Sequence, residues 1–367
     1  MKKSLLALAA LTAFAGVASA QSSVTLFGIV DLAARNVKNG SAGSIKSLSQ
    51  DGNASSRFGV RGVEDIGGGL RAGFWLEGAV SPDTGNAGAT GGGFWNRRST
   101  VSLLGGFGEL RLGRDYTPTF WNHTLFDPFG TVGIGSQNNL ILPASATTGS
   151  NVSRVLDVPR TGTGVGDART GTVIRADNSI GYFLPALGGL YGQVMVAAGE
   201  GTVGNKHIGG RLGYAAGPLN VAVAYGRTEL VREDLNAWNV GGSFNLGFLT
   251  LLGQYSKYKV DTGEPTVGGR DLKNWMLGTT VPLGSGTLKF SYAKSKGNFG
   301  ATAPNADATQ LAFGYVYDLS KRTAVYTTYS RIKNSDGARF YASSSGPFRA
   351  GTNFTSTGYE FGIRHSF

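Results

Sequence analysis

Apolar and polar residues alternate with a period of two along almost the whole chain. In Leu70–Ser81, for example, Leu70, Phe74 and Leu76 share one face and Trp75 and Glu77 the other. A period of two places successive side chains on opposite faces of a β-strand. Such segments recur at short intervals and are separated by turns rich in Gly and Pro. The pattern predicts an all-β fold of about sixteen antiparallel strands.

The first six expected strands are about Ser23–Val37, Ser56–Asp65, Leu70–Ser81, Phe94–Leu104, Glu109–Asp115 and Thr172–Pro185. The other ten centre on Val194, Leu212, Val223, Val240, Leu251, Leu277, Phe290, Phe313, Tyr326 and Phe361.

Two kinds of connection join these strands. Short turns such as Pro185–Gly189 and Pro282–Gly286 alternate with longer polar segments such as Asn39–Ser55 and Asn334–Thr355. Only 16% of residues are charged, and no segment approaches the ~20 consecutive apolar residues of a membrane helix. Short turns on one rim and long loops on the other are typical of a transmembrane β-barrel. A soluble protein of two packed sheets is the alternative, and it would need long apolar runs on its inner faces.

The N-terminus has the pattern of an export signal. Lys2 and Lys3 precede the apolar run Leu5–Val17, which ends at Ala18-Ser19-Ala20. A basic start, a short apolar region and an A-x-A site predict a signal peptide over residues 1–20. The barrel domain is then residues 21–367. The chain has no Cys, so export to an oxidising compartment adds no disulfide to the fold.

One segment, Tyr116–Gly171, is much longer than the other connections and lacks strand alternation. A long loop within a compact domain usually has a function. We expect residues 116–171 to fold into the barrel and form its constriction, with Asp127 toward the opening. The aromatic side chains expected to dock on the inner wall are Phe120, Trp121, Phe126 and Phe129.

Arginines occupy strand positions that face the lumen. Arg57 and Arg61 are four residues apart, so they share a face opposite Phe58. By the same parity Arg98 faces inward, opposite Val101. Rings of arginine favour anions in a pore, and arginine stays charged at any working pH. The alternative is that these are rim charges that bind lipopolysaccharide phosphates. The candidate constriction residues are Arg57, Arg61 and Arg98 on the wall, Arg154 on the long loop, and the opposing acids Glu77 and Asp127.

Signals for other chemistry are weak. His123 lies near Asp127 and Ser136, but closeness in sequence does not make a catalytic triad. The G-x-G-x-x-G match at Gly199–Gly204 is expected by chance among 59 glycines and precedes no helix. We therefore predict no catalytic residues, no cofactor, no metal and no nucleic-acid partner. An outer-leaflet lipid enzyme and an adhesin are the competing functions.

Four stretches carry a family resemblance: SSVTLFGIVDLA after the signal, Ser55–Phe74, Leu110–Pro118, and the terminal GYEFGIRHSF. With them the chain resembles the general porins of the Gram-negative outer membrane, especially those of β-proteobacteria. Phe27 departs mildly from the Tyr frequent there. The resemblance implies a sixteen-stranded homotrimer with an inward third external loop. It also implies outer-membrane lipid neighbours, passage of small anionic solutes, and recognition of Phe367 by the barrel-assembly machinery.

Overall fold

The computed structural model describes residues 23–87, 93–141, 173–200, 206–229, 234–261, 270–298, 305–343, 347 and 351–367. The predicted signal peptide 1–20 and the candidate Arg154 lie outside these ranges. Within the ranges, no helix combines the length and the apolar character that crossing a membrane requires.

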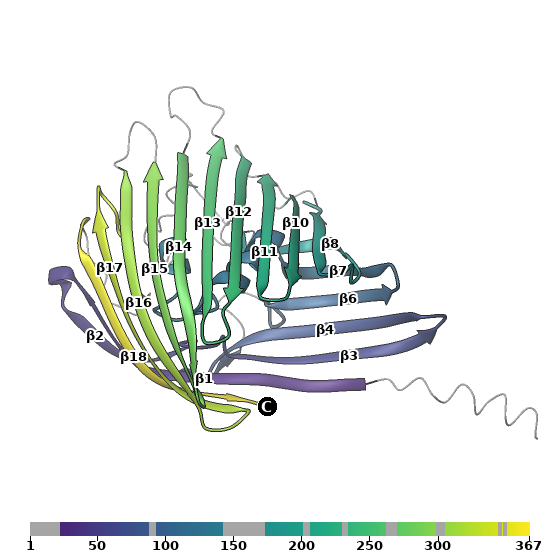
Figure 1. Cartoon of the computed structure of the whole chain (residues 1–367), viewed down its shortest axis with the longest axis horizontal. Helices are drawn as coiled ribbons and strands as arrows, with labels where there is room; N and C mark the ends of the chain where they lie inside the picture. The colour runs from purple at the N-terminus through teal and green to yellow at the C-terminus, as the bar shows by residue number, and fades with distance from the viewer. Residues whose placement is uncertain are drawn as a thin grey trace, which may run out of the picture.

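All strand pairings are antiparallel, and the strands follow one another around a wall (Figure 1). Their bounds are β1 (Ser23–Asn39), β2 (Ser44–Gln50), β3 (Arg57–Gly67), β4 (Leu70–Ser81), β5 (Asn86–Ala87), β6 (Arg98–Gly105), β7 (Gly108–Tyr116), β8 (Arg175–Phe183), β9 (Leu190–Ala197), β10 (His207–Ala216), β11 (Leu219–Glu229), β12 (Asp234–Asn245), β13 (Thr250–Asp261), β14 (Arg270–Leu283), β15 (Gly286–Asn298), β16 (Ala306–Asp318), β17 (Thr323–Ser335) and β18 (Thr355–Ser366).

Strand β1 closes the wall into a barrel. One of its edges pairs with β18, and the backbones of Gly28 and Phe367 exchange two hydrogen bonds of 3.1 Å. Along its other edge, the first half pairs with β3 and the second half with β2. Strands β2 and β3 therefore form one interrupted strand, and β5 has only two residues. Among the described residues the ring has sixteen strands, which confirms the predicted number.

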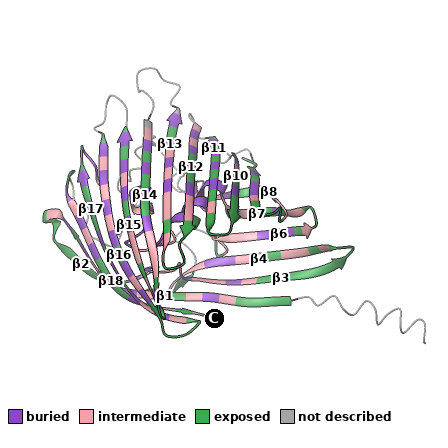
Figure 2. Ribbon diagram, viewed as in Figure 1, coloured by how far each residue is buried: buried purple, intermediate pink, exposed green. Residues whose placement is uncertain are grey.

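Burial alternates with the period of two, but the apolar side chains are on the outside. On β11, Val221 and Val223 are exposed, and on β13 Leu251 is exposed while the polar Gln254 and Ser256 are buried on the inside. Figure 2 shows the same alternation along the neighbouring strands. A wall with an exposed apolar outer face and a polar inner face suits lipid outside and water inside. This arrangement confirms the transmembrane barrel over the soluble two-sheet alternative.

Part of the segment expected to be a long loop, Asn39–Ser55, is strand. A 3-10 turn over Gly40–Ala42 leads into β2, which continues the hairpin with β1. The chain then turns inward because the carboxylate of Asp31 accepts hydrogen bonds from the backbone N–H groups of residues 52–54. Ser44–Gln50 is polar at most positions on both faces, so it lacks the apolar alternation by which the other strands are predicted.

The segment expected to be a loop without regular structure begins with a helix. Helix α2 (Pro118–Phe126) follows β7, and a short helix α3 (Asn138–Ile141) lies further on. The Thr117 side chain accepts a hydrogen bond from the Phe120 N–H, and Pro118 occupies the first helical turn. A capping Thr followed by Pro is a helix start signal. The strand-based interpretation of the sequence overlooked it.

Candidate functional site

The first part of the long segment, residues 116–141, lies against the inner wall. The side chain of Asn122 donates to Asn239 Oδ1 at 2.9 Å, and Asn239 Nδ2 donates to the Thr119 carbonyl at 2.9 Å. Asn239 is on β12 between the outward residues Trp238 and Val240. The hydrogen bonds therefore fasten α2 to the lumen side of the barrel, as the sequence analysis predicts for this segment.

Glycines on the inner face provide the surface on which this segment rests. A Cβ at Gly241 would lie 2.4 Å from Phe126 Cδ2, and one at Gly314 would lie 2.9 Å from Phe129 Cε1. Both distances are too short for a real side chain, so only glycine permits this approach. A Cβ at Gly278 on β14 would lie 2.5 Å from Pro128, and one at Gly358 on β18 would lie 3.3 Å from Ile134. Gly226 on β11 also faces the segment, but a Cβ there would be nearest to His207 and 3.6 Å from Thr119. We call these five residues the glycine seat.

A buried polar network holds the segment to β13 and β14. Gln254 Oε1 accepts from Gln137 Nε2 at 2.6 Å and lies 2.7 Å from His123 Nδ1. His123 Nε2 lies 2.6 Å from the Tyr258 hydroxyl, and Asn274 Nδ2 donates to Gln137 Oε1 at 3.2 Å. Burial lowers the pKa of His123 to about 4, so the ring is neutral at neutral pH. Its Nδ1 then donates to Gln254, and its Nε2 accepts from Tyr258.

Asp127 pins the segment internally, which corrects the expectation that it faces the opening. Its carboxylate accepts from the N–H groups of Phe129 (2.9 Å), Thr131 (3.3 Å) and Gln137 (3.2 Å), and from the Ser136 hydroxyl (2.9 Å). The residue is only 5% exposed. Burial raises the pKa of this carboxyl, against the hydrogen bonds that lower it. The side chain of Asp127 is short and follows α2 directly, so its carboxylate reaches the backbone N–H groups of the next turn. It therefore stabilises the loop and does not face the lumen.

The same geometry separates the members of the Ser-His-Asp constellation. Ser136 donates to Asp127, but both ring nitrogens of His123 are occupied by Gln254 and Tyr258. The His123 ring therefore does not accept from the Ser136 hydroxyl, and these three residues do not form a triad.

Arginines line the arc of the wall from β3 to β8, beside the start of the seated segment. Parity correctly predicts that Arg57, Arg61 and Arg98 point inward. The guanidinium carbons of Arg61 and Arg98 lie 4.9 and 4.6 Å from the ring of Trp75. Stacking on the indole holds the two charges in place, and Arg98 Nε also donates to the Thr100 hydroxyl at 3.1 Å.

Glu77 lies among these arginines instead of opposing them. Its Oε1 is 2.6 Å from Arg97 Nε and 3.9 Å from Arg57 Nε, and its Oε2 accepts from Trp75 Nε1 at 3.1 Å. The expected opposition of Glu77 to the arginines is therefore absent. The cross-strand register explains the placement, because Glu77 pairs with Gly59 on one side and with Arg98 on the other.

Two further arginines complete the cluster, and sequence reasoning missed their role. Arg97 and Arg175 donate to the Tyr116 hydroxyl at 3.2 and 3.1 Å, and Arg175 also donates to the Arg97 carbonyl at 2.7 Å. Arg97 lies just before β6, where strand parity does not apply. Arg175 is the first residue of β8, directly after the long segment. Its position at the start of a strand is the one sequence signal for a role at the constriction.

Positive charge is in excess on this surface. Arg111 forms ion pairs with Glu109 at 2.8 Å and with Asp115. Glu77 forms ion pairs with Arg97 and Arg57. Among the described residues, Arg61, Arg98 and Arg175 have no carboxylate within ion-pair distance. We call this surface the arginine wall; its cations are Arg57, Arg61, Arg97, Arg98, Arg111 and Arg175, and its acids are Glu77, Glu109 and Asp115.

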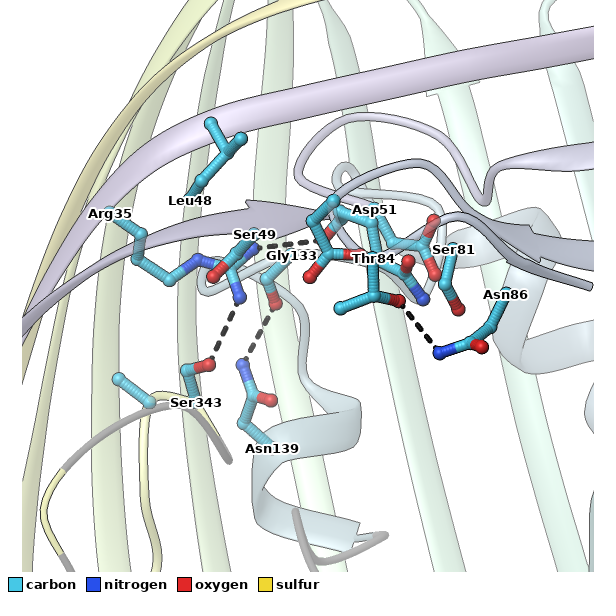
Figure 3. Close-up of a pocket in the computed structure, with 13 residues that line it drawn as sticks. Arg35, Leu48, Ser49, Asp51, Ser81, Thr84, Asn86, Gly133, Asn139 and Ser343 are labelled. Atoms are coloured by element: carbon cyan, nitrogen blue, oxygen red, sulfur yellow. Dashed lines mark hydrogen bonds between the residues drawn. The ribbon is translucent and has the colours of Figure 1, made fainter. Parts of the chain in front are cut away.

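A polar cavity of about 520 Å³ opens between the β1–β2 hairpin, residues 81–86 and the seated segment (Figure 3). Arg35 reaches toward Ser343 and Asn139 toward Gly133, with hydrogen bonds of 3.0 and 3.1 Å. Glu360 lies 2.7 Å from Arg35 Nε and neutralises it. The cavity is therefore polar, and its other charged lining residues are the acids Asp51 and Asp83, which distinguishes it from the arginine wall.

The remaining candidate, Phe367, ends the barrel at the closing strand pair. Its ring lies over Gly28, where a Cβ would be 2.3 Å from the ring, and the residue is exposed on the outer face. This position leaves the terminal aromatic accessible. Its proposed recognition by assembly machinery stays a prediction.

Comparison with known proteins places this geometry in a family. Residues 7–337 match the model of the Gram-negative porins. Outer membrane porin protein 32 of Delftia acidovorans is 38% identical over the full length of both chains. The solved anion-selective porin of Comamonas acidovorans is 34% identical, with a TM-score of 0.77 over 95% of this chain and all of that one. OmpT of Vibrio cholerae, solved in a trimer form, shares the fold at 15% identity, with a TM-score of 0.63 over 94% of this chain and 99% of that one.

Proposed function

The chain belongs to the Gram-negative porin family, and from this premise we propose that its outer-membrane channel is selective for small anions. Passive diffusion of small hydrophilic solutes needs only a water-filled path, which the polar inner face provides. The anion preference is the part that depends on the individual side chains of this chain.

The surplus of arginine on the arginine wall carries the proposal. Three of its guanidiniums have no carboxylate partner in the described structure, and α2, α3 and the glycine seat lie along the other arc of the wall, from β9 to β18. A passing anion is therefore confined near fixed positive charge. At 4 Å and an effective dielectric constant of about 20, each unit charge acts with roughly 4 kcal/mol before screening. Guanidiniums also bind carboxylate and phosphate oxygens in a bidentate manner.

A salt gradient across a planar bilayer tests the proposal. With KCl at unequal concentrations on the two sides, the zero-current potential of the purified protein is expected to have the sign that shows chloride crossing more readily than potassium. We call this a potential on the chloride side, and the opposite sign a potential on the potassium side. The preference should weaken as ionic strength rises, because the Debye length falls from about 30 Å at 0.01 M to about 10 Å at 0.1 M. A potassium-side potential at low salt would overturn the proposal.

The lipid-enzyme alternative has little support on the outer face. Its histidine candidate, His365, faces outward and hydrogen-bonds to Thr323 at 2.9 Å. Thr323 begins β17 after a short turn, so this pair lies at the rim opposite the long loops. An enzyme for outer-leaflet lipids would need its polar groups at the other rim. The relatives found are porins, and we assign no reaction to this chain.

We include in the proposal that three copies associate. Val24 and Leu26 on the outer face of β1 and Ile363 on that of β18 are 70%, 57% and 51% exposed, and the ring of Phe367 covers Gly28 between them. Such a surface can pack against a second copy as well as against lipid. Native mass measurement in mild detergent should give the mass of a homotrimer. Finding monomers alone under conditions that keep the barrel folded would contradict it.

A further inference from the structure

The polar cavity of Figure 3 lies at the external mouth of the channel. It forms where β4 ends at Ser81 and the chain continues into a long connection. In an outer-membrane barrel the long connections lie at the external rim. The cavity has a volume of about 520 Å³, and most of its lining side chains are hydroxyls, amides and carboxylates. We call it the mouth cavity.

The mouth cavity has a surplus of negative charge. Among its described lining residues Arg35 is the one cation, and Glu360 neutralises it in an ion pair of 2.7 Å. Asp51 and Asp83 also line the cavity, and neither forms an ion pair within the part of the chain that the structure describes. Gln50 adds a buried Oε1 that has no hydrogen-bond partner among the described residues. The cavity therefore has two carboxylates that no cation neutralises and an acceptor that lacks a donor.

The acids of the arginine wall differ from those of the mouth cavity. Glu77 and Glu109 form ion pairs with Arg97 and Arg111 at 2.6 and 2.8 Å, and Asp115 also pairs with Arg111. Their charge is thus neutralised within the protein, whereas the charge of the cavity is available to a solute.

The mouth cavity borders the arginine wall. Asp51 Oδ1 accepts from the Ser56 N–H at 2.6 Å, and Ser56 directly precedes Arg57 of the wall. On β4, Ser81 lies two positions beyond Ala79, the residue that pairs with Arg57. Two positions correspond to roughly 7 Å along a strand. A negative surface and a positive surface therefore meet at the mouth of the channel.

The surroundings of Asp51 favour a cationic partner. Burial raises the pKa of this carboxyl, while hydrogen bonds from Ser56 and the charge of Arg97 oppose the rise. A bound ammonium group stabilises the ionised carboxylate further, because an opposite charge nearby favours the charged form.

We propose that the mouth cavity and the adjoining part of the arginine wall bind small zwitterions of the amino-acid type. The ammonium group binds Asp51 and Asp83, and the carboxylate binds a guanidinium of the wall. The wall repels a solute that carries only positive charge, and the acids of the cavity repel one that carries only negative charge. A zwitterion is attracted by both surfaces. The inference rests on the proposed anion channel, because the arginine wall holds the carboxylate end.

Osmotic swelling of liposomes tests this inference, because it measures the entry of solutes that carry no net charge. Serine and glyceramide are isomers, and at neutral pH serine is a zwitterion whereas glyceramide is uncharged. At low ionic strength we expect the parent protein to admit serine about twofold faster or more, after subtraction of the rate in protein-free liposomes. The reason is that a charged cleft raises the local concentration of a solute that it attracts. Equal rates for the two solutes would overturn the inference.

The double variant Asp51→Asn with Asp83→Asn removes both charges and keeps the size of both side chains. The amide oxygen at position 51 still accepts from the Ser56 N–H, so the turn keeps this hydrogen bond. An exposed ion pair is worth up to about fivefold in binding, so the ratio of serine to glyceramide entry should fall about twofold or more. Asp83→Lys is a second variant at an exposed position, and it should lower the ratio by repelling the ammonium group. An unchanged ratio in either folded variant would contradict the inference.

The matched control is Glu64→Gln with Asp65→Asn, which removes two exposed acids beside the short turn between β3 and β4, on the opposite rim. Its amide oxygen at position 65 can still accept from the Gly67 N–H, as Asp65 does at 2.8 Å. The control should keep the parent ratio, and an equal loss there would count against the mouth cavity.

A KCl gradient separates this inference from the proposed anion selectivity. The double variant should stay on the chloride side, because it loses two acids and no arginine. A parent potential on the potassium side would refute the anion selectivity itself. A parent potential on the chloride side together with equal entry of serine and glyceramide would refute only the zwitterion site.

Discussion

Replacing Arg57 and Arg98 together with glutamate is expected to move the zero-current potential from the chloride side to the potassium side. The arginine wall has six arginines and three carboxylates. The double substitution leaves four arginines and five carboxylates, so the surplus of three positive charges becomes a deficit of one. The barrel should fold, because inward side chains in a wide lumen are not needed for the backbone hydrogen bonds of the wall.

Three comparisons make this measurement specific. Glu77→Gln removes an acid that Arg97 and Arg57 share, and it should strengthen the preference for chloride. Arg57→Lys with Arg98→Lys should keep the sign and weaken the discrimination in favour of carboxylates, because lysine lacks the bidentate fork. The outward variant Lys273→Gln with Lys294→Gln should leave the potential unchanged. If the double glutamate variant still preferred chloride at low salt, the selective charge would have to lie elsewhere, with Arg154 the next candidate.

Strand parity was sufficient to orient the wall. Alternation alone assigned Arg57 and Arg98 to the lumen, and the structure agrees because a period of two leaves no freedom once one face is apolar. Parity could not predict the orientation of side chains beyond the ends of the strands. Arg97 precedes β6, and Arg175 follows the long segment, so their side chains are placed by Tyr116 and by tertiary contacts.

The seat of the inward segment could not be predicted from composition. In the sequence, glycine marks the turns between the expected strands. Gly241 and Gly314 instead lie at inward positions inside strands, where glycine weakens the strand unless another backbone or side chain approaches closely. Inward glycines on successive strands are a signal that parity could have revealed. Asp127 has no such signal, because its four donors lie in the irregular turn over residues 129–137, which no periodic pattern in the sequence predicts.

Removing residues 124–148 is expected to raise single-channel conductance about twofold or more, because the narrowest width of a water-filled pore limits its current. The deletion takes away the side chains that occupy most of the glycine seat, including Phe126 and Phe129. Residues 149–174 are long enough to rejoin β8 across the lumen, at up to about 3.3 Å per residue. Recordings in symmetric KCl at high salt would measure width with little influence from the arginine wall.

A single substitution should act in the opposite direction through the same contact. Gly241→Val puts a branched side chain where a Cβ would already lie 2.4 Å from Phe126, so α2 must move off β12 toward the lumen and lower the conductance. Valine favours strands, so the strand itself should not suffer. Gly210→Val is the control, because Gly210 faces outward and its nearest neighbour would be 3.4 Å away. If the folded deletion variant and Gly241→Val both kept the parent conductance, the segment would not define the narrow part of the channel.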